Sequence, residues 1–172
     1  KKANFYGMLK HTDNSGPELF VVGIGASAGG SQALEAFFSN IDDHPNAAFV
    51  VVQHLSPDFR SMMSEILQRK TVMQVRQVEE AMPLEPGTVY VMPPGKNMLL
   101  EGRTFYLTAR SSHLDYPINL FFDSMAKHFA ERAIGVILTG GGSDGTDGLQ
   151  TISRSGGVAL VQTPESAQFD SM

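Results

Sequence analysis

The sequence contains no cysteine. This absence excludes disulfide scaffolds, thiolate-ligated zinc, iron–sulfur clusters and a cysteine nucleophile. It is compatible with a reducing compartment, and we expect a cytoplasmic location. Long apolar runs are also missing: none approaches the ~20 residues that a membrane-spanning helix requires. We therefore expect no membrane insertion.

Positive charge is scarce as well. Thirteen Lys and Arg residues against 18 Asp and Glu residues give a formal net charge of −5. A surface that binds nucleic acid or an anionic bilayer requires a dense basic patch, so we expect neither partner. Apolar residues make up 42% of the chain and charged residues 18%, which is enough apolar side chain to build a core and argues against disorder.

The chain divides into a short polar segment and one domain. Residues 1–18 are polar and show no sustained period, so we predict a linker or tail there. Residues 19–172 have the length and apolar content of a single domain. Because Ser166–Met172 is too short to complete another helix and strand, we expect the native polypeptide to continue past Met172.

Apolar runs and helical periods alternate along this domain. Short β-branched runs without polar alternation indicate strands that are covered on both faces, which is typical of a parallel sheet. Helical periods recur within 34–41, 59–67 and 118–129. The pattern predicts an α/β fold with a doubly wound, mainly parallel sheet and helices on both faces. Proline and glycine break up residues 71–108, where we predict a β-hairpin insertion. The apolar runs are 20–24, 49–52, 134–138 and 158–161.

Three polar residues follow the apolar runs: Ser27, His54 and Asp144. In a doubly wound sheet, ligands bind at the carboxyl ends of the strands. A serine hydroxyl, an imidazole and a carboxylate are the groups that a serine hydrolase needs as nucleophile, base and orienting acid. The convergence of three individually weak signals at one expected edge favours a hydrolase.

The segment around Ser27 supports three interpretations. Residues 25–29 read Gly-Ala-Ser-Ala-Gly, which matches the G-x-S-x-G turn that exposes a nucleophilic serine. Amides at the start of the following helix could stabilise an oxyanion. Gly23, Gly25 and Ala28 also fit a dinucleotide fingerprint, but that fingerprint needs an acidic residue about 20 positions further on, where this chain has Gln53-His54. The third interpretation is close packing of a strand against a helix.

His54 and Asp144 also have structural alternatives, since most histidines are surface or core residues and a glycine-rich turn often binds no ligand. The loop Asp144–Gly148 resembles a calcium loop only loosely, because it lacks the required spacing of acidic residues and the terminal glutamate. The order Ser27, His54, Asp144 differs from the usual α/β-hydrolase order of serine, acid, histidine. An ordinary lipase or esterase is therefore disfavoured.

Several motifs in this order resemble the catalytic domain of the CheB chemotaxis methylesterases. The resemblance implies that Ser27 is the nucleophile, His54 the base and Asp144 the orienting acid. It further implies that Ala28, Gly29, Gly141 and Gly142 form the oxyanion and active-site loops. The matching stretches are 22–30, 53–57, 91–95, 135–140, 142–145, 156–157 and 169–172.

The family resemblance also implies a substrate class and partners. The substrates would be glutamyl γ-methyl esters on receptor helices, with glutamine deamidation as a second reaction, and neither reaction needs a metal or an organic cofactor. Stand-alone members usually carry Thr, Met and Asn where this chain has Ala28, Gly141 and Ser143. The Ala28 and Ser143 forms resemble the variant that is fused to a CheR-type methyltransferase, so a covalently linked methyltransferase domain is the expected partner.

Two other functions remain open from the sequence. The first is a nucleotide-binding module that uses the glycine-rich turn at 23–30. The second is a non-catalytic docking module within a larger signalling protein, in which the three polar residues persist without turnover.

Overall fold

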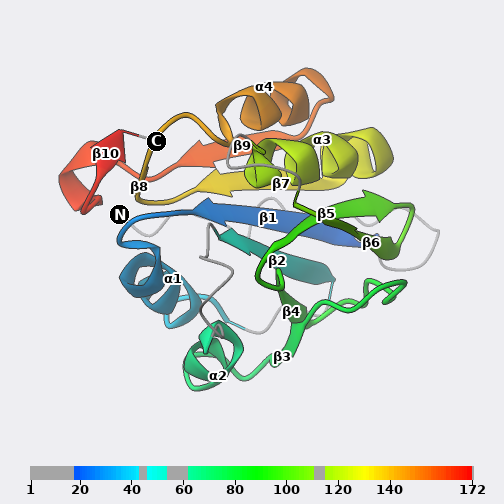
Figure 1. Ribbon diagram of the computed structural model, residues 1–172, viewed down its shortest axis with the longest axis horizontal. Helices are drawn as coiled ribbons and strands as arrows, with labels where there is room; N and C mark the ends of the chain where they lie inside the picture. The colour runs from blue at the N-terminus through cyan, green and yellow to red at the C-terminus, as the bar shows by residue number, and fades with distance from the viewer. Residues whose placement is uncertain (1–17, 43–45, 54–61, 111–114, 172) are drawn as a thin grey trace.

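The computed structural model describes residues 18–42, 46–53, 62–110 and 115–171 (Figure 1). Of the linker expected at residues 1–18, only Glu18 falls within these ranges, so that expectation stays a prediction. His54 and part of the second helical period also lie outside them.

Six parallel strands form the central sheet, in the order β3-β4-β2-β1-β7-β9. The strands β1, β2, β4 and β7 are buried along their whole length, which explains why their sequences are apolar without alternation. The predicted parallel sheet is thus confirmed. The strand bounds are β1 Phe20–Ala26, β2 Ala47–Gln53, β3 Gln74–Gln77, β4 Thr88–Val91, β7 Ala133–Ile137 and β9 Val158–Val161.

Helices cover both faces of this sheet (Figure 1). On one face α1 (Gly30–Phe38) and α2 (Met63–Gln68) bury Leu34, Phe38 and Leu67 in one apolar cluster. On the other face α3 (Pro117–Phe129) and α4 (Thr146–Arg154) complete a second cluster. The doubly wound arrangement is confirmed. None of the helices in the described ranges is long and apolar enough to cross a bilayer.

The hairpin insertion is shorter than predicted. Only β5 (Lys96–Glu101) and β6 (Thr104–Ala109) pair as an antiparallel hairpin. The strands β3 and β4 lie within the range expected for the insertion but pair in parallel inside the main sheet. The sequence pattern failed here because β4 is only four residues long and the neighbouring prolines and glycines resemble hairpin turns.

Residues 158–161 form a strand as predicted, but they are not buried. Residues of β9 alternate between half-buried and exposed, and Val161 is 61% exposed. The strand pairs with β7 alone in the described sheet, and its position at the edge explains the difference. Continuation of the polypeptide past Met172 stays a prediction.

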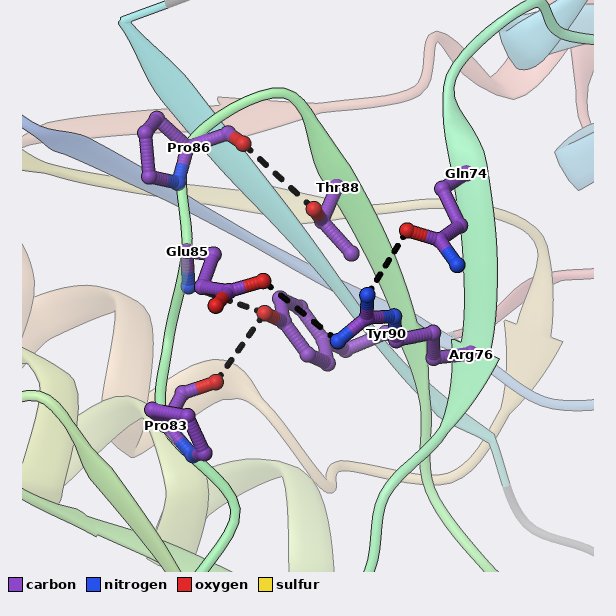
Figure 2. Close-up of polar contacts among 7 residues, drawn as sticks. All are labelled: Gln74, Arg76, Pro83, Glu85, Pro86, Thr88 and Tyr90. Atoms are coloured by element: carbon purple, nitrogen blue, oxygen red, sulfur yellow. Dashed lines mark hydrogen bonds and ion pairs between the residues drawn. The ribbon is translucent and has the colours of Figure 1, made fainter.

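Tyr90 ties the segment between β3 and β4 to the sheet (Figure 2). Its buried hydroxyl donates to the carbonyl of Pro83 at 3.1 Å and accepts from the amide of Glu85 at 2.8 Å. Its ring packs on Phe105 of β6, with 4.8 Å between centroids. Arg76 adds an ion pair to Glu85 at 3.4 Å. One side chain therefore connects the sheet, the connecting segment and the hairpin.

The Tyr90→Phe variant should lose about 1–3 kcal/mol of unfolding free energy near neutral pH, because it leaves the part-buried amide of Glu85 and carbonyl of Pro83 without their partner. Burial raises the pKa of Tyr90 above its usual 10.0, and the Glu85 charge adds to this. The hydroxyl therefore stabilises the fold below pH 10, and this contribution declines as pH rises through the folded pKa. Urea unfolding near neutral pH and above pH 10 should show the gap between parent and variant shrinking.

The control is Tyr106→Phe, because Tyr106 is 37% exposed and should tolerate the loss of its hydroxyl. An equal loss in both variants would contradict the role given to the Tyr90 hydroxyl.

Candidate active site

The carboxyl ends of three central strands lie level with one another. Ala26, the last residue of β1, pairs with Gln53, the last residue of β2. Gly25 pairs with Ile137, the last residue of β7. Ser27 follows Ala26 directly in the chain, so the structure confirms its expected position at this edge of the sheet. His54 follows Gln53 directly but lies outside the described residues, so its role as base stays a prediction.

Ser27 lies on a sharp turn from strand to helix. Its amide donates to the carbonyl of Thr139 at 3.2 Å, and its carbonyl accepts from the amide of Gly30, where α1 begins, at 2.9 Å. Gly29 has φ 73° and ψ 0°, the conformation that the third residue of a type II turn requires. Ser27 is half-buried and Ala28 is exposed. The turn thus leaves the serine partly accessible at the start of a helix.

The glycines of this turn also permit close packing. A Cβ atom at residue 30 would lie 2.9 Å from the Cβ of Ala26 and 3.0 Å from Nε2 of Gln53. A Cβ atom at residue 29 would lie 2.6 Å from Oε1 of Gln168. The packing interpretation of the glycines is therefore correct in part, and it is compatible with a nucleophile turn because both need the same close approach.

Asp144 is buried, with 6% of its surface exposed. Its two carboxylate oxygens accept from the amides of Ile118 at 3.0 Å and Asn119 at 2.9 Å. Both amides belong to the first turn of α3, where no acceptor is available within the helix. The positive end of the helix dipole also favours a carboxylate there. The carboxylate is therefore fixed in place by backbone groups.

Ile118 and Ile137 connect the Asp144 loop to the strand that carries Ser27. A Cβ atom at Gly25 would lie 2.7 Å from each of these side chains. A Cβ atom at Gly145, whose φ is 104°, would also collide with both. The backbone two residues before Ser27 and the backbone directly after Asp144 thus pack against the same pair of isoleucines.

Gly141 and Gly142 are exposed beside these strand ends. The short strand β8 (Gly140–Gly141) pairs in parallel with β10 (Asp170–Ser171), so residues distant in sequence meet next to the turn. Nothing lies within 4 Å of the position that a Cβ atom would take at Gly142. The space at this loop is open, and an oxyanion role for its amides stays a prediction.

Thr139 is a residue near the site for which the sequence predicts no role. It is buried, and its amide donates to Oε1 of Gln162 at 2.8 Å. Its hydroxyl oxygen accepts from the amide of Phe169 at 2.8 Å and lies within hydrogen-bond distance of the carbonyls of Ala28 (3.3 Å) and Phe169 (3.0 Å). Thr139 therefore joins the Ser27 turn to the C-terminal segment. Its only sequence signal is its position directly after an apolar strand.

Comparison with known proteins identifies the family. The family model for the CheB methylesterase matches residues 22–172. The chain belongs to the CheB methylesterase family. Its solved relatives include the CheB methylesterase catalytic domain of Thermotoga maritima, with a TM-score of 0.81, 28% sequence identity, and coverage of 90% of this chain and 85% of that one. The family resemblance and the fold expected from the sequence are thereby confirmed.

Curated relatives are longer than this chain. This chain is 39% identical over 145 residues to protein-glutamate methylesterase/protein-glutamine glutaminase 3 of Paramagnetospirillum magneticum. The alignment covers 83% of this chain and 41% of that protein. This chain is 45% identical over 111 residues to an uncharacterized 104.1 kDa protein of Rhodobacter capsulatus. That alignment covers 64% of this chain and 12% of that protein. The chain thus spans less than half the length of either relative.

The Thr139→Val variant should loosen the C-terminal segment, because it leaves the amide of Phe169 without an acceptor. We expect the unfolding free energy to fall by about 1–2 kcal/mol. Amide hydrogen exchange at Phe169 and Gly140 should accelerate, since Gly140 donates to the carbonyl of Phe169. Thr151→Val is the control, because the Thr151 hydroxyl bonds only within α4. Unchanged exchange at Phe169 would contradict this role of Thr139.

Proposed function

We propose that this chain is the catalytic domain of a serine methylesterase in chemotaxis-type adaptation. Its substrates are glutamyl γ-methyl esters on the cytoplasmic helices of receptors, and glutamine side chains are deamidated by the same site. The observation that carries the proposal is a partly accessible serine on a strand-to-helix turn, at the end of the sheet where a buried carboxylate is anchored. Membership of the CheB methylesterase family supports it.

The reaction proceeds through an acyl-enzyme. The Ser27 hydroxyl attacks the ester carbonyl carbon while His54 accepts its proton. Amides of Ala28, Gly29, Gly141 or Gly142 stabilise the tetrahedral oxyanion. Methanol leaves with the proton from His54. Water, deprotonated by His54, then attacks the acyl-enzyme and releases the glutamate side chain and free Ser27. A glutamine substrate follows the same course and releases ammonia.

Asp144 orients His54 in this mechanism. The amides of Ile118 and Asn119 each occupy one carboxylate oxygen. Each oxygen of a carboxylate can accept more than one hydrogen bond, so the two amides do not prevent an imidazole N–H from binding the same group. A carboxylate held by backbone amides is well suited to fix the tautomer of the base.

The nucleotide-binding alternative has weaker support. The strand β2 ends at Gln53, which is buried, and within the described part of the chain this strand end offers no carboxylate to bind a ribose hydroxyl. The docking alternative predicts a folded domain that does not hydrolyse the ester, so a measurement of activity distinguishes it from the esterase.

A covalently linked CheR-type methyltransferase domain is a further part of the proposal. The exposed residues Ala28 and Ser143 resemble the sequence variant of such fusions, which supports this part of the proposal. The Rhodobacter capsulatus relative has a mass of 104.1 kDa, of which this domain type matches 12%, so the domain occurs in much larger polypeptides.

Ser27→Ala and His54→Ala should each remove nearly all hydrolysis of a methylated receptor substrate while leaving the fold intact. The members of a catalytic triad act as a unit, so the double variant should be scarcely slower than either single variant. Methanol release measures the rate, and circular dichroism verifies the fold. A fluorophosphonate probe should label the parent at Ser27.

Half of the parent activity remaining in Ser27→Ala would exclude the proposed mechanism. Thermal stabilisation by a nucleotide without covalent labelling would favour the nucleotide-binding module instead.

Asp144→Asn should reduce turnover by about 10⁴-fold, by analogy with serine proteases, because the amide favours the wrong imidazole tautomer. In the variant, the side-chain NH₂ group also faces one of the two α3 amides that donate to the carboxylate in the parent. Asp147→Asn is the matched control, because Asp147 is exposed in the first turn of α4. Steady-state turnover of both variants tests the role of Asp144. An unchanged rate in Asp144→Asn, with a chelator-sensitive parent, would indicate a metal site.

A further inference from the structure

The side chain of Asn119 has two acceptor contacts in the Asp144 loop. Its Oδ1 atom accepts from the amide of Gly145 at 2.9 Å and from the amide of Gly148 at 2.8 Å. Its own backbone amide donates to Oδ1 of Asp144 at 2.9 Å. Asn119 therefore contacts Asp144 directly and also holds the residue that follows it.

These contacts make a reciprocal pair of helix caps. The helix α3 begins without a side-chain cap from its own N-terminal residue, Tyr116, and Asp144 accepts from its first-turn amides instead. The residue before α4, Gly145, has no side chain to cap the helix, and Asn119 accepts from the amide of Gly145 and from that of Gly148 in the first turn. Uncapped first-turn amides would need other acceptors, so each helix start depends on a residue from the other segment.

Close packing leaves little freedom at this junction. A Cβ atom at Gly148 would lie 2.6 Å from the Cβ of Phe122 and 3.1 Å from the Cα of Asn119, so α3 and α4 meet almost backbone to backbone. The hydrogen bonds of Asn119 are therefore made within a tight interface. Removing its oxygen leaves these two part-buried amides without their side-chain acceptor.

We propose that Asn119 is a positioning residue of the methylesterase, which fixes the Asp144 carboxylate by holding the peptide groups of Gly145 and Gly148. The inference rests on the proposed function, in which Asp144 orients His54. Only the oxygen of the Asn119 side chain takes part in these bonds. A carboxylate at position 119 supplies the same acceptor, and the amides of α4 favour its charge.

The experiment compares Asn119→Ala with the conservative Asn119→Asp. A misplacement of about 1 Å can cost about 10²-fold in rate, so we expect kcat of Asn119→Ala to fall by about 10- to 100-fold with KM nearly unchanged. Asn119→Asp should restore most of the parent kcat. Ser124→Ala is the matched control on the same helix, because Ser124 Oγ accepts from the amide of Leu100 at 3.0 Å, far along α3 from Asp144. It should keep the parent kcat.

Amide hydrogen exchange supplies a readout that does not depend on activity. In Asn119→Ala, exchange should accelerate by about tenfold or more at the amides of Gly145 and Gly148, because they lose their acceptor. It should also accelerate at the amides of residues 118 and 119, because their acceptor, the Asp144 carboxylate, is no longer held in place. In Ser124→Ala it should accelerate at Leu100 instead. Unchanged exchange at Ile118, a parent-like kcat in Asn119→Ala, or failure of Asn119→Asp to restore kcat would overturn the inference. A parent no more active than Ser27→Ala would disprove the proposed function, and exchange would still decide whether Asn119 fixes Asp144.

Discussion

The level register of β1 with β2 and β7 is the constraint on which the site depends. Ala26 lies opposite Gln53, and Gly25 lies opposite Ile137, so three chain segments leave the sheet at one edge. A shift of one residue in any of these strands would turn its side chains to the other face, and both faces are buried under helices. Burial of the strands fixes their register, and the register therefore determines where the functional loops leave the sheet.

Backbone contacts, more than side-chain contacts, bring these loops together. Thr139 accepts from the Ser27 amide, and the amides of α3 bind the Asp144 carboxylate. A buried carboxylate costs several kcal/mol unless hydrogen bonds replace its water, and the otherwise unsatisfied amides of a helix start provide them. The same hydrogen bonds therefore stabilise the start of α3 and fix the position of the carboxylate in the site.

The sequence predicts the architecture well wherever a strand is long and covered on both faces, as in β1 and β2. It fails at β4, which is four buried residues between turn signals, and at β9, whose apolar composition conceals its position at the sheet edge. In the site, Ser27 and Asp144 could be predicted because each follows an apolar run. Thr139 and Asn119 could not, because their hydrogen bonds to other segments join residues at least 23 positions apart and leave no local pattern.

The choice of glycine at 145 follows from the same geometry. Gly145 has φ 104°, which L side chains rarely adopt, and a Cβ atom there would be too close to the side chain of Ile137 and 3.0 Å from that of Ile118, so a side chain would strain the backbone and force its neighbours to shift. It would also move the amide that Asn119 binds and, with it, the neighbouring Asp144. Gly145 is therefore required by close packing as well as by its backbone conformation. It allows a helix start, a carboxylate and a strand end to pack against two isoleucines at once.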